Sequence, residues 1–226
     1  MFRSHTIRAL VVAGTAVLTA VTAGSGLPSA AATTGAPSAD TPPVTPQPQR
    51  MTPLGEDVQV PKDVSVVAGR HVDQPTRDLL TRVLESVGAE NVDFLEPGAR
   101  PSAPLTVRVG SLDAEDVARE LRDAGVEVPE NLGAEGYALA ATGDTVVLGG
   151  VDPDGIYYSA QTLRQLAGDG RIAGTGVVDQ PLMPLRGAIE GFYGSPWTHQ
   201  ERMDQLAFYG DVKMNTYVYA PKDDPY

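Results

Sequence analysis

The chain has 226 residues, with 29 acidic against 17 basic side chains and a net charge of −12 at pH 7. Because nucleic acids and anionic membranes require clustered Lys and Arg, this balance argues against both as partners. The chain has no cysteine and only three histidines, so disulfides and cysteine-ligated metal centres are excluded, and we expect no cofactor and no metal site.

The N-terminus has the three parts of a secretory signal peptide. Arg3 and Arg8 precede an apolar stretch at residues 9–24, and Ala30 and Ala32 provide the small residues of a cleavage site. The apolar stretch is shorter than the roughly 20 residues of a membrane span and contains three threonines. We therefore expect a signal peptide over residues 1–32, a secreted, extracellular protein and no stable membrane association.

The next segment, residues 33–57, is rich in Thr, Pro, Ala and Ser and has few large apolar side chains. Such a composition buries too little surface to offset the entropy lost on ordering. We expect a disordered linker here, with the folded part of the chain starting near Val58.

Strand and helix patterns alternate after Val58, which is typical of a layered α/β domain. A short apolar run at residues 64–67 predicts a strand, and apolar residues at helical spacing predict a helix over residues 77–87, closed by Gly88. Alternation at residues 105–109 predicts the next strand.

Asp113 is a candidate N-cap for a second helix, which we expect to end at Gly125. Residues 137–141 and 145–148 read as two strands joined by a turn at Gly143.

A third helix is expected to begin at Asp154 and to end at Gly168. These elements form one α/β domain over residues 58–182, with a boundary at the prolines Pro181 and Pro184.

The last part of the chain predicts a strand, a helix and a second strand. Residues 187–192 read as a buried strand and residues 216–220 as the next one. The helix between them starts either with Pro196 at its first turn or with a capping box at Thr198. A strand–helix–strand unit of this length is typical of a parallel sheet.

Two motifs in this part resemble the opening of the catalytic barrel in glycoside hydrolase family 84. They read Arg186-Gly187-x-x-Glu190-Gly191-Phe192-Tyr193-Gly194-x-Pro196-Trp197 and Asn215-Thr216-Tyr217-Val218-Tyr219-Ala220-Pro221-Lys222-Asp223-Asp224. That family holds the O-GlcNAcases and bacterial β-N-acetylglucosaminidases, some of them described as hyaluronidases.

The preceding domain is similar to the small α/β domain that precedes the barrel in hexosaminidases. The similarity lies in Glu135-Gly136-Tyr137-x-Leu139 and Gly155-x-x-Tyr158-x-x-x-Thr162-Leu163-x-Gln165-Leu166. The resemblance implies an α/β fold: a hexosaminidase-type domain at 58–182, then the first βαβ unit of a truncated TIM (β/α)8 barrel at 183–226.

The resemblance also implies a function. Family members remove terminal N-acetylglucosamine from glycans or glycoconjugates with retention, and the substrate's own 2-acetamido oxygen is the nucleophile. Two adjacent aspartates late in the family's barrel assist the reaction. Because neither position exists in this chain, we expect no catalytic residue here and an inactive fragment.

Two substrate-binding residues follow from the motifs. Gly191 matches a family glycine whose backbone contacts the sugar, and Lys222 matches a lysine that hydrogen-bonds a sugar hydroxyl. A glycine at a strand end allows close approach of a ligand, and a lysine at a barrel strand's carboxyl end faces the pocket rim. The alternatives are that Gly191 relieves crowding and that Lys222 is a surface charge.

Other candidates have structural interpretations. Asp223 and Asp224 lie at a strand end where the family has no catalytic residues, and Glu190 is expected in an ion pair rather than as a general acid. Tyr193 and Trp197 are expected to pack under the helix.

The pattern Asp152-x-Asp154-Gly155 contains part of a calcium loop but lacks its later ligands. We interpret it as a turn with a helix cap.

Two rival functions remain open. A family 20 hexosaminidase shares the first domain but differs in the barrel motifs. A non-catalytic secreted module would bind glycans or a partner through residues 58–178.

Overall fold

The computed structural model describes residues 42–191 and 195–219. The predicted signal peptide at residues 1–32 lies outside these ranges. Within the described residues, no helix has the length and apolar character needed to cross a membrane.

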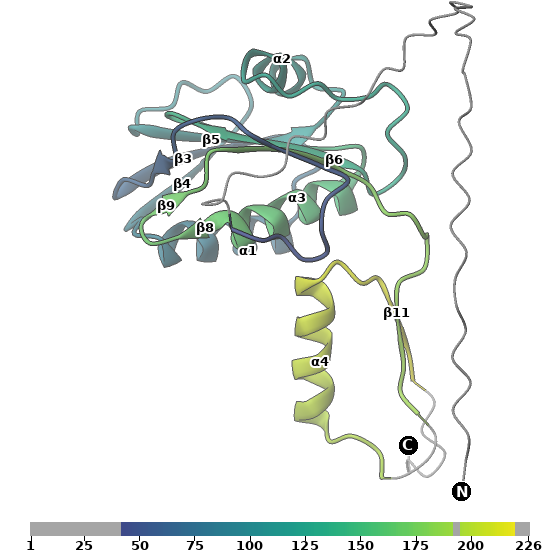
Figure 1. Cartoon of the computed structure of the whole chain (residues 1–226). Coiled ribbons are helices and arrows are strands. Elements are labelled where there is room, and N and C mark those ends of the chain that lie inside the picture. Colours follow the sequence, from purple (N-terminus) through teal and green to yellow (C-terminus); the bar gives the residue numbers. More distant parts are fainter. Residues whose placement is uncertain (1–41, 192–194, 220–226) are drawn as a thin grey trace, which may run out of the picture. The chain divides into compact units, whose positions relative to one another are not determined.

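A seven-stranded sheet forms the centre of the α/β domain, with the strand order β1-β10-β6-β7-β5-β3-β4 (Figure 1). Strands β4, β3, β5 and β7 are parallel to one another, whereas the pairs β7–β6, β6–β10 and β10–β1 are antiparallel. The strands are β1 (Arg50–Pro53), β3 (Asp63–Ala68), β4 (Asn91–Leu95), β5 (Leu105–Ser111), β6 (Tyr137–Thr142), β7 (Thr145–Gly150) and β10 (Thr175–Asp179). A small second sheet has the order β2 (Val58–Gln59), β9 (Arg171–Ile172) and β8 (Ala167–Gly168).

Helices cover both faces of the large sheet. Helices α1 (Gln74–Ser86) and α3 (Pro153–Leu166) lie together on one face, and α2 (Glu115–Asp123) lies on the other (Figure 1). This layered arrangement confirms the expected α/β fold class for the domain.

The sheet has a core on each face because its side chains alternate in direction. Along β6, Tyr137, Leu139 and Ala141 belong to the core beneath α1 and α3. Ala138 and Ala140 belong to the core beneath α2. Burial on both faces explains why the strand reads as a nearly continuous apolar run.

The glycine signals at Gly88, Gly125 and Gly143 are confirmed, but α3 ends at Leu166 and Gly168, its expected end, lies in strand β8. Gly88, Gly125 and Gly143 have φ angles of +113°, +82° and +60°, which an L side chain rarely adopts.

The predicted starts of the three helices of the domain are all wrong, by three residues for α1, which begins at Gln74, and by one residue each for α2 and α3. Ala114, not Asp113, is the N-cap of α2, and the backbone N–H of Asp113 donates to the Ser111 hydroxyl instead. Helix α3 begins at Pro153 rather than Asp154, since the Asp152 carboxylate accepts a hydrogen bond from the Gly155 N–H at 2.8 Å. A proline at the first helical position fixes this choice.

The predicted linker at residues 33–57 contains an ordered strand, so the prediction that folding starts near Val58 is wrong. Strand β1 pairs antiparallel with β10, and Met51 packs against the core. Sheet pairing uses main-chain groups, which every residue except proline provides in full. A Thr- and Pro-rich composition therefore did not reveal an edge strand.

The last described elements form the predicted strand–helix–strand unit. Strands β11 (Gly187–Ile189) and β12 (Thr216–Val218) pair in parallel, and α4 (His199–Asp211) connects them. Thr198 caps α4 in a capping box with Glu201, which settles the start in favour of the capping box. The outer ends of the two predicted strands lie outside the described residues.

Candidate functional site at the ends of strands β11 and β12

Parallel pairing places the carboxyl ends of β11 and β12 at the same edge. Gly187 lies opposite Thr216, and Ile189 lies opposite Val218. A Cβ atom on Gly187 would fall 1.6 Å from the Thr216 carbonyl oxygen, so only glycine fits there. This contact holds the two strands at close range at their amino ends.

Gly191 follows β11 at the carboxyl edge and is exposed. A Cβ atom built on it would meet no described atom within 4 Å. Among the described residues, therefore, nothing supports the alternative that Gly191 relieves crowding. Its contact with a sugar stays a prediction.

Lys222, the second predicted binding residue, lies outside the described residues. The same holds for Tyr193, Asp223 and Asp224. Their predicted roles stay predictions.

Glu190 precedes Gly191 and is almost completely buried, with 2% of its surface exposed. Arg202 of α4 donates from Nε and Nη2 to its two carboxylate oxygens, at 2.8 and 2.9 Å. The Trp197 backbone N–H donates to Oε1 at 3.1 Å, and the Tyr217 hydroxyl donates to Oε2. The prediction that Glu190 forms an ion pair is confirmed.

These contacts fix the charge of Glu190. The hydrogen bonds from Arg202, together with those from Tyr217 and Trp197, lower the pKa of its carboxyl to about 2 against the opposing effect of burial. A carboxylate that stays ionised at neutral pH cannot donate a proton to a leaving group. Glu190 therefore has a structural role, in which its carboxylate holds the backbone at Trp197 in place.

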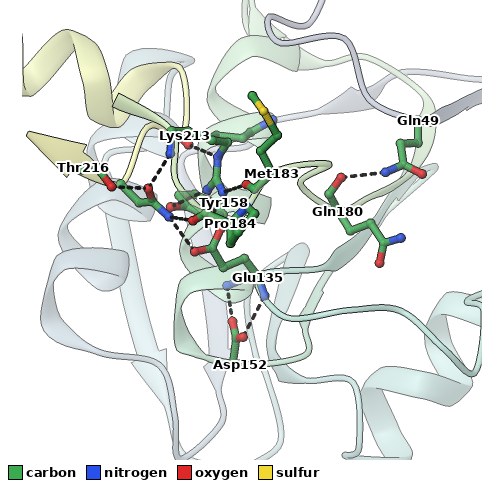
Figure 2. A network of polar contacts seen from close by, with 12 residues as sticks. Gln49, Glu135, Asp152, Tyr158, Gln180, Met183, Pro184, Lys213 and Thr216 are labelled. Carbon is green, nitrogen blue, oxygen red and sulfur yellow. Dashed lines mark hydrogen bonds and ion pairs between the residues drawn. The ribbon is translucent and has the colours of Figure 1, made fainter. Parts of the chain in front are cut away.

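A second polar network lies at the amino ends of the same strands (Figure 2). Glu135, in the loop before β6, forms an ion pair with Arg186, the residue before β11. Its other oxygen accepts from Asn215 Nδ2 at 2.9 Å, and Asn215 is the residue before β12. One carboxylate of the α/β domain thus contacts the starts of both strands.

The Asp152 carboxylate binds the backbone of Glu135. Its Oδ2 accepts from the Glu135 backbone N–H at 2.8 Å while Oδ1 caps α3, and Figure 2 shows Asp152 next to Glu135. The interpretation of Asp152 as a helix cap is confirmed.

A buried lysine forms a third contact between the same regions. Lys213 is 6% exposed and donates from Nζ to the Tyr137 hydroxyl at 2.9 Å. That hydroxyl also lies 2.7 Å from Thr162 Oγ1 and donates to Asp179 at 3.0 Å. Burial lowers the pKa of Lys213 to about 8, although Asp179 opposes the shift.

The same residues border a cavity of about 220 Å³. Its walls include the aromatic rings of Tyr137 and Tyr158 and the polar groups of Glu135, Arg186 and Lys213. Each of these polar groups has a partner within the protein, so the cavity offers few groups to a ligand.

The sequence motifs include Glu135, Arg186 and Asn215 but assign them no role. The signal that could have found Arg186 and Asn215 is their position, since each directly precedes a predicted strand. Lys213 belongs to no motif and has no sequence signal.

Comparison with known proteins gives the class of this chain. Residues 186–226 match the family model described as beta-N-acetylglucosaminidase, and residues 41–180 match the model for domain 2 of glycosyl hydrolase family 20. The chain thus resembles glycoside hydrolases, and its last part resembles β-N-acetylglucosaminidases. Because the second model matches more than half of the chain, the chain belongs to the family of glycosyl hydrolase family 20 domain 2.

Individual relatives point in the same direction. The chain is 43% identical to Protein O-GlcNAcase of Rattus norvegicus and 40% identical to that of Mus musculus, over 58 residues in each case. These matches cover 26% of this chain and 6% of either relative.

Solved structures are similar over more of the chain. CpGH84D has a TM-score of 0.73 at 26% identity, and CpGH84B has 0.67 at 28% identity. The matches cover 83% and 80% of this chain, but only 32% and 30% of those proteins. A beta-N-acetylhexosaminidase from Bacteroides fragilis shares the fold at 13% identity, with a TM-score of 0.57 over 78% of this chain and 32% of that one. Together these findings confirm the resemblance to glycoside hydrolase family 84. The chain spans about a third of the length of CpGH84D and of CpGH84B.

Proposed function

We propose that this chain is part of a secreted β-N-acetylglucosaminidase of the family 84 type. Such an enzyme removes terminal N-acetylglucosamine from glycans or glycoconjugates. The observation that carries the proposal is the family match over residues 186–226, the segment that contains both Gly191 and Lys222. A family 20 enzyme is the weaker alternative, because that family matches only the preceding domain.

The proposed mechanism is retaining and substrate-assisted. The 2-acetamido oxygen of the sugar attacks its own anomeric carbon, so the protein must orient the acetamide and protonate the leaving oxygen. The proposal assigns those two roles to an aspartate pair outside these 226 residues. Glu190 does not replace it, since its carboxylate is held ionised by Arg202.

The proposed contribution of this chain is to sugar binding. The exposed backbone of Gly191 would approach the sugar closely, and Lys222 would hydrogen-bond one of its hydroxyls. In the sequence, Gly191 follows β11 and Lys222 follows β12, two strands that pair in parallel, and barrel enzymes form their pockets beyond the carboxyl ends of such strands.

The proposed secretion is supported by the pattern of residues 1–32. Expression in a secreting host tests it: the exported protein should begin after Ala32 by N-terminal sequencing. Retention of an intact N-terminus on the exported protein, or failure of export, would contradict it.

Turnover of an aryl β-N-acetylglucosaminide tests the enzymatic proposal. We expect no turnover by the 226-residue chain, and hydrolysis by the protein encoded when the genomic reading frame continues past codon 226. NMR should show the β-anomer as the first product. In that longer protein, Lys222→Ala should lower kcat/KM roughly ten- to a hundredfold through the loss of one charged hydrogen bond.

Two outcomes would count against this interpretation. A folded longer protein without turnover would remove the enzymatic proposal. Turnover by the 226-residue chain itself, abolished by Lys222→Ala, would show that its catalytic groups are within this chain. A stop at codon 226 would favour the non-catalytic module, which glycan-array binding by residues 42–180 would test.

A further inference from the structure

Glu135 projects from a rigid part of the α/β domain. Its backbone has a φ angle of +60°, in the left-handed region, and its N–H is held by Asp152 at the start of α3. Next to it, a Cβ atom on Gly155 would fall 2.3 Å from the Gly136 carbonyl oxygen. The loop and the first turn of α3 are therefore in close contact, which leaves the Glu135 carboxylate little freedom.

That carboxylate contacts two residues that are also bonded to each other. The Arg186 backbone N–H donates to Asn215 Oδ1 at 3.0 Å, and the Asn215 N–H donates to the Arg186 carbonyl oxygen at 2.8 Å. The Thr216 N–H donates to the same carbonyl at 3.0 Å. Glu135, Arg186 and Asn215 thus form a closed three-residue ring, which we call the strand-start clamp.

The guanidinium of Arg186 is held from further directions. It donates from Nη1 to the Met183 carbonyl at 2.8 Å and from Nε to the Lys213 carbonyl at 3.0 Å. It also lies over the Tyr158 ring, 5.6 Å from the centroid. Only 18% of the Arg186 side chain and 17% of that of Glu135 are exposed, so water weakens the ion pair less than at an open surface.

We infer that Glu135 is a positioning residue: it docks the β11–α4–β12 unit on the α/β domain and fixes the stagger of β11 relative to β12. The α/β domain then acts as an intramolecular template for the pairing of β11 with β12. This role is separate from the proposed hydrolysis and does not depend on it.

The clamp acts at the edge opposite to the candidate binding residues. Gly191 lies five residues beyond Arg186, about 17 Å along an extended strand. Because strands are stiff along their length, a shift at the clamped ends moves the carboxyl ends by a similar amount. The stagger set by Glu135 therefore determines how the carboxyl ends of β11 and β12 are aligned.

Hydrogen exchange of the whole 226-residue chain tests this inference. In Glu135→Ala, the inter-strand amides of Glu190, Asn215 and Thr216 should exchange about tenfold faster. Amides of β3, β5 and β7 should keep their rates. Glu135→Gly is the second variant, since glycine accepts the left-handed backbone without strain while also removing the carboxylate.

Glu120→Ala is the matched control. Glu120 forms a comparable ion pair with Arg108, at 2.6 Å and with 24% of its side chain exposed, but entirely within the α/β domain. Its loss should speed exchange in α2 and β5 and leave β11 and β12 unchanged.

Two results would overturn the inference. One is unchanged exchange in β11 and β12 in both Glu135 variants. The other is an equal acceleration throughout the seven-stranded sheet, which would make Glu135 a general stabiliser of its own domain. Neither readout uses sugar turnover, so failure here and failure of the proposed function are distinguishable.

Discussion

Single side chains near β11 and β12 show how burial and pairing decide the charge of a group. Glu190 and Lys213 are both buried, and the pKa of each is lowered. A lowered pKa keeps the Glu190 carboxyl ionised, but it favours the neutral form of the Lys213 amine. Glu190 has Arg202 as a charged partner and stays ionised. Lys213 has a neutral hydroxyl as its hydrogen-bond partner, so burial dominates and favours the neutral amine.

Because of Lys213, the free energy of unfolding should rise with pH. Its pKa is about 8 in the folded protein, against 10.5 for an unperturbed lysine, so the folded state loses its proton first. Between about pH 7.5 and pH 9.5 the free energy of unfolding should rise by about 2 kcal/mol. Urea unfolding, followed by the fluorescence of Trp197, the single tryptophan, measures this.

Lys213→Met is the control for that measurement. Both side chains meet the same backbone strain at φ +61°, so the comparison isolates the charge. The groups facing the amine are Tyr137 and Asp179, and burial raises the pKa of Tyr137 well above 10. A rise with pH that persists in Lys213→Met would refute the assignment.

Glu190 predicts a loss of stability in acid, in the same direction as Lys213 but at lower pH. Its pKa is about 2 in the folded protein, against 4.5 for an unperturbed glutamate, so its contribution is complete above pH 4.5 and is lost as the pH falls toward 2. Trp197 fluorescence should report this loss, because the Trp197 N–H binds Glu190. In Glu190→Gln the acid transition should lack this contribution. An identical acid profile in both proteins would contradict the prediction.

At the scale of elements, two glycines of the β11–α4–β12 unit differ in the room that the described residues leave for a side chain. Gly187 has no room for a Cβ atom, whereas a Cβ atom on Gly191 would meet none of the described atoms within 4 Å. The first glycine serves strand pairing, and the second has no such packing requirement from the described residues.

Gly187→Ala should therefore weaken the unit, and Gly191→Ala should not. Forcing a methyl group against the Thr216 carbonyl should cost about 1–3 kcal/mol of unfolding free energy. For Gly191→Ala we expect a change of no more than about 0.5 kcal/mol. Urea midpoints from Trp197 fluorescence measure both, and equal midpoints for the two variants would rule out the close approach.

The elements also show what the sequence can predict. The helices α1 and α3 followed from apolar spacing, and the glycines after α1 and α2 followed from the backbone they require. The edge strand β1 was missed because its pairing with β10 uses main-chain groups and leaves no apolar pattern. The ion pair of Glu190 was predicted because a buried acid in a strand needs a partner.

The strand-start clamp could not be predicted in the same way. Glu135 and Arg186 are 51 residues apart, and their contact depends on the tertiary arrangement of two regions. Lys213 was missed for a similar reason, since its burial against Tyr137 depends on a contact across 76 residues.

Over the whole described molecule, apolar surface is distributed unevenly. Both cores are built from residues 44–178, within the α/β domain. The β11–α4–β12 unit instead exposes several large apolar side chains, namely Ile189, Met203, Leu206, Phe208, Val218 and Tyr219. Exposed apolar side chains in this number on so short a segment favour association.

The 226-residue chain should thus aggregate more readily than a shortened chain of residues 42–180. The shortened chain keeps both cores and should unfold in one cooperative thermal transition. Light scattering at matched concentration measures the difference. Equal scattering by the two chains would show that the exposed side chains do not drive association.

Strand β1 also sets a practical limit on where this domain can be cut. It supplies the outermost strand of the large sheet, and Val44 and Thr45 before it contact the core and Gln165. A recombinant protein that began at Val58, where composition alone would place the start, would leave the hydrogen-bonding groups of β10 open to solvent. Such an edge can recruit a strand from another molecule, so the truncated domain would turn a self-contained sheet into a template for dimers.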